Sequence, residues 1–502
     1  MTALVSVLAL ALALALPAAS LGNHAFANPA PYVDLTAAAA GGQIVPLINS
    51  GDEYHGVTFE GIPDGIGYVP GSGTVDLYVA HEQSHVPFSG FADFQDSSVS
   101  RVTVDVTAKQ VVGLDVALSP DLGFLRFCSA FMAGPDHGFS DYTFFVNEET
   151  NDIVPVPAGA PYGSDPAIAP YRQGGYAAAL NTSTEEVTTL SRMGRHNHEN
   201  TVIVPGGWKK TVSLSGDDTF SAPSSQLYLH TANDAAQVMS DKGQLWAFQV
   251  TATQDGAVDP ADPFNDANDY LEITAGDEFS GRFIHVPTDI ARGLTDEPPQ
   301  QALENWSNEN NVFQFVRVED LAYDPDDPRT VYFTDTGTSR LAEDPATGRL
   351  TRLSSGGVST NGRVFKMVLN AQDPRIVDAL TILVDAADIG MRSPDNMDVG
   401  HNSIMVQEDT SNAKIWRYDL DLAAPTWTHV ATANQPSAET SGIVDVSDIF
   451  GAGWWALDVQ SHINESEGTE TLTYTAPISG ATQQYKERRE DGQLLLMHIP
   501  GS

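Results

Sequence analysis

Short apolar or alternating segments recur along almost the whole chain, and they constrain its fold more than any other feature. Clusters of Gly, Pro, Asp and Asn separate these segments, as the turns between β-strands require. The predicted strands are Val75–Ala80, Tyr142–Val146, Thr201–Val204, Gln226–His230, Gln244–Val250, Val331–Thr334, Gly362–Leu369, Ser403–Val406, Lys414–Leu420, Trp454–Val459 and Leu494–Ile499. Amphipathic segments of helix length are scarce. The pattern therefore predicts an all-β sandwich, barrel or propeller.

Carboxylates directly follow several of these strands, and this arrangement favours the propeller. The strand–acid combinations are Val75–Ala80 with Glu82, Tyr142–Val146 with Glu148 and Glu149, Val331–Thr334 with Asp335, Ser403–Gln407 with Glu408, and Trp454–Leu457 with Asp458. Because the innermost strands of a propeller line its central channel, acids at their ends can converge there. Their mutual repulsion would then require cations. Acids after strands are also ordinary turn residues, so only the repetition is informative.

The expected architecture is all-β: a single β-propeller, with six blades as the expected number, loop insertions and few short helices. No strict repeat of blade length is visible, so the sequence period does not give the blade number. Asp255–Glu278 is predicted to be a solvated acidic loop. Gly293–Asn311 is expected to hold one short helix, and Val377–Asp388 fits a strand or a short helix equally well.

The charge balance excludes some classes of partner. The chain carries 66 acidic and 25 basic side chains, and its formal net charge is −41. Such a surface cannot neutralise a run of phosphates, which argues against nucleic acid, and it would be repelled by an anionic membrane. The acidic excess fits either solubility in a salty medium or carboxylates that hold cations.

The N-terminal segment predicts export. Residues Ala3–Pro17 are almost entirely apolar, and Ala25–Ala27 fits a small-x-small cleavage site. The apolar run is too short to span a bilayer comfortably. We expect a signal peptide at residues 1–27, a single propeller domain at 28–502, and a secreted or periplasmic protein without stable membrane association.

Two further features leave alternatives open. Cys128 is the only cysteine, so it cannot form an internal disulfide; it is either a buried thiol or a thiolate metal ligand. The densest polar cluster is His196–Asn200, next to a predicted strand. Because strand side chains alternate, either His196, His198 and Asn200 or Asn197 and Glu199 would face the channel. A hydrogen-bonded polar loop fits the spacing equally well.

Taken in chain order, the polar clusters resemble the PhoX-type alkaline phosphatases, a secreted β-propeller family. The residues that carry the resemblance are Asp64-Gly65, His81-Glu82, Cys128, Glu148-Glu149, Gly194-Arg195, His198-Glu199, Gly216-Asp217-Asp218, Arg317-Val318-Glu319-Asp320, Pro394-Asp395-Asn396, Glu408-Asp409, Glu439-Thr440-Ser441-Gly442 and Val459-Gln460. Each motif alone is weak, but their order spans nearly the whole chain after residue 27.

The resemblance implies a monomeric metal-dependent phosphomonoesterase with calcium and iron at the propeller axis. It implies that Cys128 is an iron ligand. The other implied candidates for metal ligands are Glu148 or Glu149, Glu199, Asp217 or Asp218, Glu319, Asp395 and Glu408. Carboxylates suit calcium and ferric iron, and a thiolate selects a softer transition metal. Metal ions would neutralise a phosphate ester, and Arg195 and Arg392 are the candidates for a cationic clamp on it.

Two other functions compete with this hypothesis. One is a different calcium-dependent propeller hydrolase, such as a lactonase or a phytase-like enzyme, which would need no thiolate. The other is a non-catalytic propeller whose calcium is structural. Iron together with calcium would favour the phosphatase, and calcium alone would favour the other hydrolases.

Overall fold

The computed structural model describes residues 30–82, 97–219, 225–467, 471–475, 480–485 and 488–502. The predicted signal peptide at residues 1–27 lies outside the described residues. The main strands fall into four-stranded antiparallel units, which follow one another along the chain. In the described part of the chain we count six of them.

The first three units come from the N-terminal half of the chain. Their strands are β5 (Pro63–Pro70), β6 (Thr74–His81), β7 (Ser98–Asp105) and β8 (Gln110–Leu118); β9 (Phe127–Ala133), β10 (Thr143–Glu148), β13 (Ala177–Asn181) and β14 (Val187–Thr189); and β15 (His198–Ile203), β16 (Thr211–Asp217), β17 (Leu227–Ala232) and β18 (Gln244–Thr253).

The last three units complete the ring. Their strands are β21 (Val318–Tyr323), β22 (Thr330–Asp335), β25 (Arg363–Leu369) and β26 (Ile376–Asp385); β27 (Pro394–Val399), β28 (Ser403–Glu408), β29 (Lys414–Asp419) and β30 (Trp427–Ala433); and β31 (Glu439–Asp445), β32 (Trp454–Glu467), β35 (Arg488–His498) and β2 (Gln43–Asn49). An additional strand, β20 (Glu278–His285), joins β18 to β26 and so fuses the third and fourth units into one sheet.

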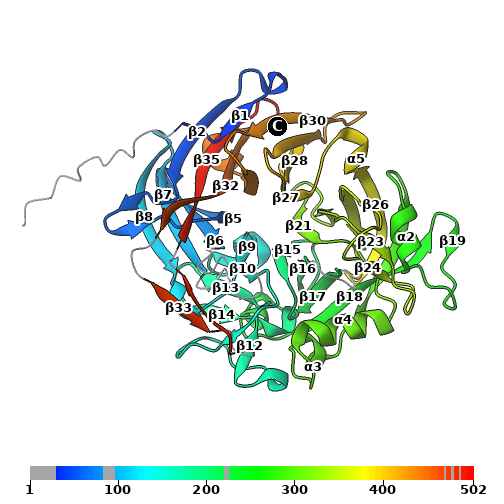
Figure 1. The fold of residues 1–502 in the computed structure, drawn as a ribbon. Helices are drawn as coiled ribbons and strands as arrows, with labels where there is room; N and C mark the ends of the chain where they lie inside the picture. The colour runs from blue at the N-terminus through cyan, green and yellow to red at the C-terminus, as the bar shows by residue number, and fades with distance from the viewer. Residues whose placement is uncertain (1–29, 83–96, 220–224, 468–470, 476–479, 486–487) are drawn as a thin grey trace, which may run out of the picture.

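The first strands of the six units surround a common centre (Figure 1). Each of β5, β9, β15, β21, β27 and β31 contacts the next one, and β31 contacts β5, so the ring is closed. A separate apolar cluster lies between each pair of neighbouring units: for example, Phe248 and Phe333 pack between the third and fourth, and Trp455 and Ile415 between the fifth and sixth. The predicted all-β propeller class is confirmed, and we interpret the arrangement as six blades.

Strands from opposite ends of the chain share the last blade. β2, from the N-terminal part, pairs with β35, from the C-terminal part, and Ile44 stands opposite Met497. β1 (Val33–Leu35) pairs in the same way with β30, at the edge of the fifth blade. The backbone hydrogen bonds of these ladders therefore close the ring between the two ends of the chain.

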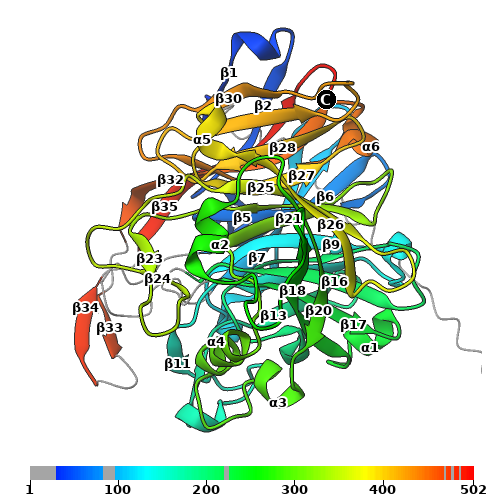
Figure 2. The same ribbon diagram turned by 90° about the vertical axis from the view of Figure 1, so that its right-hand side faces the viewer.

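The remaining elements lie in insertions and outer connections. The helices are α1 (Ala235–Val238), α2 (Ala267–Glu272), α3 (Thr288–Ala291), α4 (Pro299–Glu309), α5 (Ala386–Ile389) and α6 (Ser447–Phe450). The small strands pair as β3 (Glu53–Tyr54) with β4 (Val57–Thr58), β11 (Ile153–Pro155) with β12 (Tyr171–Gln173), β18 with β19 (Gly256–Ala257), β23 (Leu341–Glu343) with β24 (Leu350–Arg352), and β33 (Leu472–Thr475) with β34 (Thr482–Tyr485). Figure 2 shows α3 and α4 next to each other outside the sheets.

The insertions compare with the predictions as follows. The helix expected in Gly293–Asn311 is α4, and the ambiguous segment Val377–Asp388 contains both the end of β26 and the start of α5. The predicted acidic loop Asp255–Glu278 holds β19 and α2, and Asp266 caps the helix through its hydrogen bond from the Asp269 backbone N–H.

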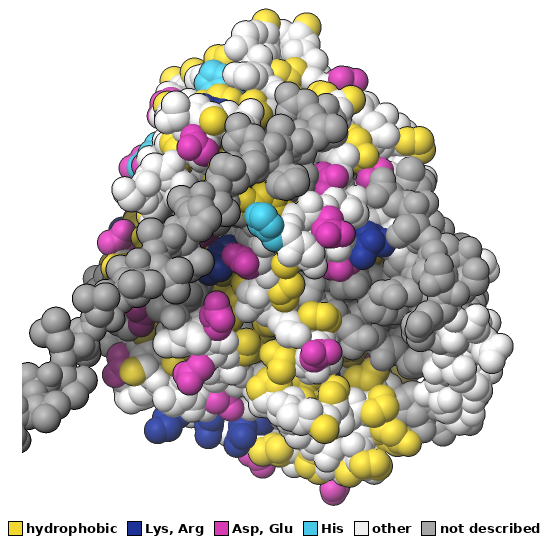
Figure 3. Space-filling view, turned by 90° about the vertical axis from the view of Figure 1, so that its left-hand side faces the viewer, with side chains coloured by type: hydrophobic (Ala, Val, Ile, Leu, Met, Phe, Trp, Pro, Cys, Tyr) yellow, Lys and Arg dark blue, Asp and Glu magenta, His cyan; other side chains and the backbone are white. Residues whose placement is uncertain are grey.

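No helix within the described residues has the length and apolar character needed to cross a membrane. Figure 3 shows acidic side chains scattered over one face of the molecule.

Candidate metal centre

One end of the central ring is built in a similar way in the six blades. In five of them the start of the first strand lies opposite the end of the second strand, and in the sixth Ser441, two residues into β31, lies opposite Asp458 within the longer β32. The pairs at this end are Pro63 with His81, Phe127 with Glu148, His198 with Asp217, Val318 with Asp335, Pro394 with Glu408 and Ser441 with Asp458. In each blade the register shifts within three residues of this pair. Such bulges break the alternation of side chains and can re-aim them toward the axis.

This geometry corrects one step of the sequence argument. The strands that run directly into carboxylates lie within β6, β10, β22, β28 and β32, which are the second strands of their blades and not the innermost strands. The innermost strands begin at this end of the ring, and the acids that converge are mainly near their starts, as with Asp64 in β5 and Glu319 in β21. The acids at the ends of the second strands reach the same level because the two strands are antiparallel.

In four blades, a residue with a left-handed backbone conformation lies two positions before an acid or thiol of the central cluster. Ile62, Arg126, Arg317 and Ser393 have φ angles of 48°, 39°, 61° and 47° and precede Asp64, Cys128, Glu319 and Asp395. This conformation costs residues other than glycine roughly 1–3 kcal/mol each and is concentrated at functional sites. The strain is therefore repeated where the chain turns into the ring.

Seven side chains at this end of the ring form groups that can hold metal ions. The groups are Asp64, Glu82 and Cys128; Cys128, Glu149 and Glu199; and Glu199, Glu319 and Asp395. Within each group the ligand atoms lie within 4.8 Å of one another, and Cys128 and Glu199 each belong to two groups. The three groups therefore form one continuous chain of donors across the axis. Cys128, Glu149, Glu199, Glu319 and Asp395 were proposed from the sequence.

Cys128 and Glu199 lie at the middle of this chain. Cys128 Sγ lies within hydrogen-bond distance of two carboxylates, 3.5 Å from Asp64 Oδ2 and 3.3 Å from Glu199 Oε1, and its single proton can be donated to either one. Ser129 Oγ also donates to Glu199 Oε1, at 2.7 Å. Glu199 Oε2 has no hydrogen-bond partner among the described residues, although the side chain is completely buried. A buried carboxylate oxygen without a donor is costly, so this atom needs a positive group beside it.

The pKa shifts within the cluster also indicate that it needs positive charge. Burial, reinforced by neighbouring carboxylates, raises the pKa of Glu199, Glu149 and Glu319 well above the usual glutamate value. Burial also raises the pKa of the Cys128 thiol, and Asp64 and Glu199 add to this effect. The ionised forms of these groups are thus unstable together unless cations accompany them.

Two arginines approach the cluster from its exposed side. Arg317 binds Asp218 through Nε at 2.8 Å and Nη2 at 3.1 Å, and Nη2 lies 3.2 Å from Glu319 Oε1. Arg126 Nη1 lies 3.6 Å from Glu149 Oε2 and 3.8 Å from Glu82 Oε2. The two side chains are 16% and 24% exposed, so both guanidinium groups border the cluster and solvent.

Four other acids proposed as ligands have different contacts. Glu148 is fully buried against Arg172, with Oε1–Nη2 at 2.6 Å and Oε2–Nη1 at 2.8 Å. Glu408 accepts from Trp416 Nε1 and from the Arg392 backbone N–H. Asp217 accepts from Thr219 and Gln300, and Asp218 from Arg317. None of the four belongs to the ligand groups found among the described residues.

Arg195 and Arg392, the two arginines proposed as a clamp, differ in their surroundings. Arg195 is completely buried, binds Asp165 through Nη1 at 2.8 Å, and lies 3.6 Å from the centre of the Tyr176 ring. The Arg392 side chain is exposed. Arg126 and Arg317, in contrast, form ion pairs with Glu149 and Glu319 of the metal groups.

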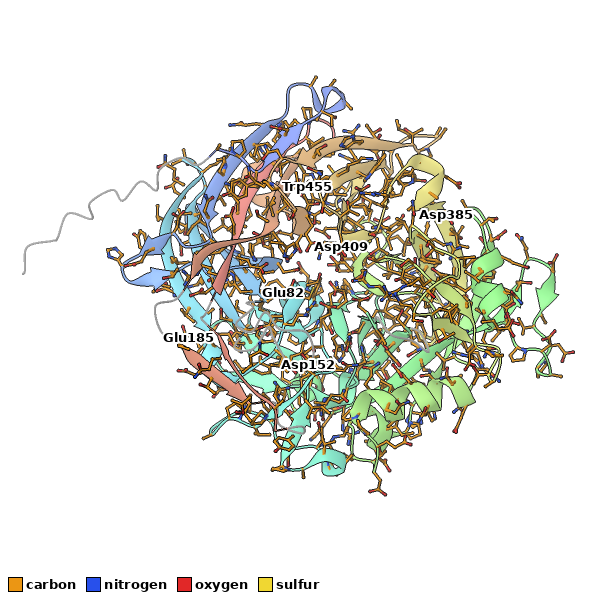
Figure 4. All side chains as sticks on the ribbon, in the orientation of Figure 1. Glu82, Asp152, Glu185, Asp385, Asp409 and Trp455 are labelled. Atoms are coloured by element: carbon orange, nitrogen blue, oxygen red, sulfur yellow. The ribbon has the colours of Figure 1, made fainter. Side chains whose placement is uncertain are left out.

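The sequence reasoning left out several residues of the cluster. Asp64 was quoted only as part of the family resemblance, and Glu82 was noted as an acid that follows a strand, but neither was proposed as a metal ligand. Gln460 donates to both of them, at 2.9 and 3.1 Å. In Figure 4, Glu82 and Asp409 lie near the centre of the ring, whereas Glu185 and Asp385 lie toward the outside.

Comparisons with known proteins relate the chain to one family and to known folds. The family described as alkaline phosphatase PhoX matches residues 171–433. The structure of Pseudomonas fluorescens PhoX in complex with vanadate, a transition-state analogue, aligns with 93% of this chain and 96% of its own at a TM-score of 0.60 and 14% identity. The β-propeller domain of Cps50 (Swd1) from Myceliophteria thermophila covers 86% of this chain and 99% of its own, at a TM-score of 0.31 and 7% identity. No curated protein matches the chain.

Proposed function

The chain belongs to the alkaline phosphatase PhoX family, and we propose that the cluster at the ring centre holds the metal ions with which it hydrolyses phosphate monoesters. The family match covers more than half of the chain, and it makes the protein a metal-dependent alkaline phosphatase. The observation that carries the assignment of the site is the buried, unpartnered oxygen of Glu199 within a chain of carboxylates and one thiol.

The donors fit calcium and iron together. Asp64, Glu82, Glu149, Glu319 and Asp395 supply hard oxygen atoms, which suit calcium and ferric iron. Cys128 supplies the only thiol of the chain, and a thiolate favours a transition metal over calcium. We therefore propose that iron binds beside Cys128 and that calcium binds among the carboxylates.

The residues of the chain would bind and orient the ester. When bound, the metal ions supply positive charge and lower the pKa of water, as a phosphate dianion and its nucleophile require. Arg126 and Arg317 would hold the phosphate oxygens from the solvent side, because guanidinium groups bind phosphate in a fixed, two-pronged geometry. Gln460 would keep Asp64 and Glu82 in position through its two hydrogen bonds.

Elemental analysis together with turnover of p-nitrophenyl phosphate tests this proposal. Purified protein is expected to contain iron and calcium, and a chelator is expected to abolish turnover. Glu199→Gln is expected to lose metal and activity while it remains folded, and Glu185→Gln, on the outside of the ring, is the matched control (Figure 4). A Glu199→Gln protein with full metal content and full activity would refute the site.

Two further properties remain proposals. The apolar run and the small-x-small sequence before residue 28 support export to the periplasm or the medium. The closed ring, which one chain completes by itself, supports a monomer acting on small phosphate esters. Fractionation of expressing cells and sedimentation of the purified protein test these two points.

A further inference from the structure

A second cavity lies at the other end of the central ring. It has a volume of about 520 Å³ and is lined by the late residues of the innermost strands, including Tyr68 in β5, Tyr323 in β21 and Asp445 in β31. The metal cluster uses the early residues of the same strands, such as Asp64 and Glu319. The lining begins directly beside the cluster, because Asn200 and Asp320 follow Glu199 and Glu319 by one residue, and it extends to the level of Tyr68, roughly 13 Å beyond that of Asp64. None of the seven donors of the metal groups lines the cavity, so the two sites share strands but not side chains.

The walls of the cavity combine negative charge with aromatic rings. The acids among its lining residues are Asp136, Asp320, Asp398, Asp445 and Asp448. The aromatic residues are Tyr68, Phe131, Tyr142 and Tyr323. No Lys or Arg occurs among the described residues that line it. Of its two histidines, His137 donates to or accepts from Tyr323 Oη at 2.9 Å, and burial lowers its pKa to about 4, so the ring is neutral.

The floor of the cavity offers a buried acceptor without a donor. Asn200 lines the cavity and is only 1% exposed. Its Nδ2 atom donates to the Leu321 carbonyl at 3.1 Å and to Asp320, which fixes the orientation of the amide. Its Oδ1 atom has no hydrogen-bond partner within the described part of the chain. A ligand with an N–H or O–H group would satisfy this oxygen.

We propose that this cavity binds an organic ammonium cation. The ionised carboxylates attract its positive charge, the tyrosine and phenylalanine side chains that line the cavity offer rings for cation–π contact, and an ammonium N–H can donate to Asn200 Oδ1. A phosphate or carboxylate would meet no Lys or Arg among the described lining residues and would be repelled by the acids that are ionised; burial raises the pKa of Asp320, Asp398 and Asp445. A bare metal ion would make no use of the aromatic walls, which occupy space that oxygen ligands would need.

Calorimetric titration of the metal-loaded protein with spermidine, in a buffer without amines, tests the proposal. We expect one saturable site for each chain. Asp448→Asn is expected to weaken binding by about threefold to fivefold because it removes one wall charge at an exposed position. Tyr68→Leu is expected to weaken it by about threefold because it removes a π-face. Asp255→Asn, an exposed acid in an insertion remote from the lining residues, is the control for general attraction to the acidic surface.

The outcomes separate this site from its alternatives. A single site that Asp448→Asn and Tyr68→Leu weaken, and that Asp255→Asn leaves unchanged, supports the proposal. Absence of saturable binding, or equal weakening by all three variants, would overturn it. Binding of calcium that is lost in Asp448→Asn, without binding of spermidine, would also overturn it, because the cavity would then hold a divalent cation.

Discussion

Glu148 and Glu149 are adjacent glutamates with opposite environments, so replacing each with glutamine separates a structural role from a ligand role. Glu148 receives two hydrogen bonds from Arg172 and two more from the backbone N–H groups of Leu125 and Tyr176. Both partners of the ion pair are fully buried. Glu148→Gln would leave the Arg172 guanidinium without a counter-charge in the interior, and we expect a loss of about 3–5 kcal/mol in the free energy of unfolding.

Glu149 is expected to respond in the opposite way. Burial and the nearby Asp218 and Glu82 raise its pKa well above the usual value, and Arg126 only partly compensates. In protein stripped of metal, Glu149→Gln removes an unfavourable charge, so the free energy of unfolding should stay the same or increase. In protein prepared with metal, the same variant should lose bound metal and phosphatase activity.

Urea unfolding followed by tryptophan fluorescence, on chelated protein at pH 8, measures the two stabilities, and elemental analysis measures metal content. Folded Glu148→Gln should retain metal close to the wild-type ratio. The reasoning would be refuted if Glu148→Gln cost less than about 1 kcal/mol, or if it lost metal while Glu149→Gln kept it.

Other predictions follow from the site and the core. Cys128→Ser should lose iron more than calcium, and its activity should fall at least about tenfold; equal loss of both metals would contradict the assigned role of the thiol. Arg317→Lys should keep its metal but lose about tenfold or more in kcat/KM for p-nitrophenyl phosphate, since lysine lacks the two-pronged geometry; unchanged kinetics would remove Arg317 from the site. Burial raises the pKa of Asp335 to about 7, so the folded state keeps a proton that the unfolded state has lost above pH 4. Wild-type stability should therefore fall as pH rises toward 7, and the advantage of Asp335→Asn should grow by at most about 3 kcal/mol between pH 5 and 8; urea unfolding of chelated protein at both pH values checks this, and a constant difference would contradict it.

The fold could be predicted from the sequence because the patterns that indicate its strands and turns are local. Short strands between turn residues are visible in the residue order, and every blade except the last is built from strands that follow one another closely in the chain. The fusion of two blades through β20 was not predicted, because no strand was assigned to the segment that follows the acidic loop. Pairing of β2 with β35 could not be predicted, since it joins residues more than 400 positions apart.

The site was only partly accessible because bulges decide which side chains point inward. Strict alternation allows Glu199 or Asn200 to face the channel but not both, whereas the register shift between His198 and Thr201 brings Glu199 to the metal cluster and Asn200 to the second cavity. The same effect separates Glu148 from Glu149. The positions of Arg126 and Arg317 beside the metal cluster were not predicted. They depend on left-handed backbone conformations, which the residue types at those positions do not indicate.

The closure of the ring by the two ends of the chain has a consequence for biogenesis. Asp64, in the first blade, accepts hydrogen bonds from Ser441 and Gln460, in the last one. The donors for metal can thus come together only after nearly the whole polypeptide has been synthesised. Bound ions would then act as cross-links between blades that are remote in the chain, so that a partly made molecule stays empty and a loaded one is locked against opening.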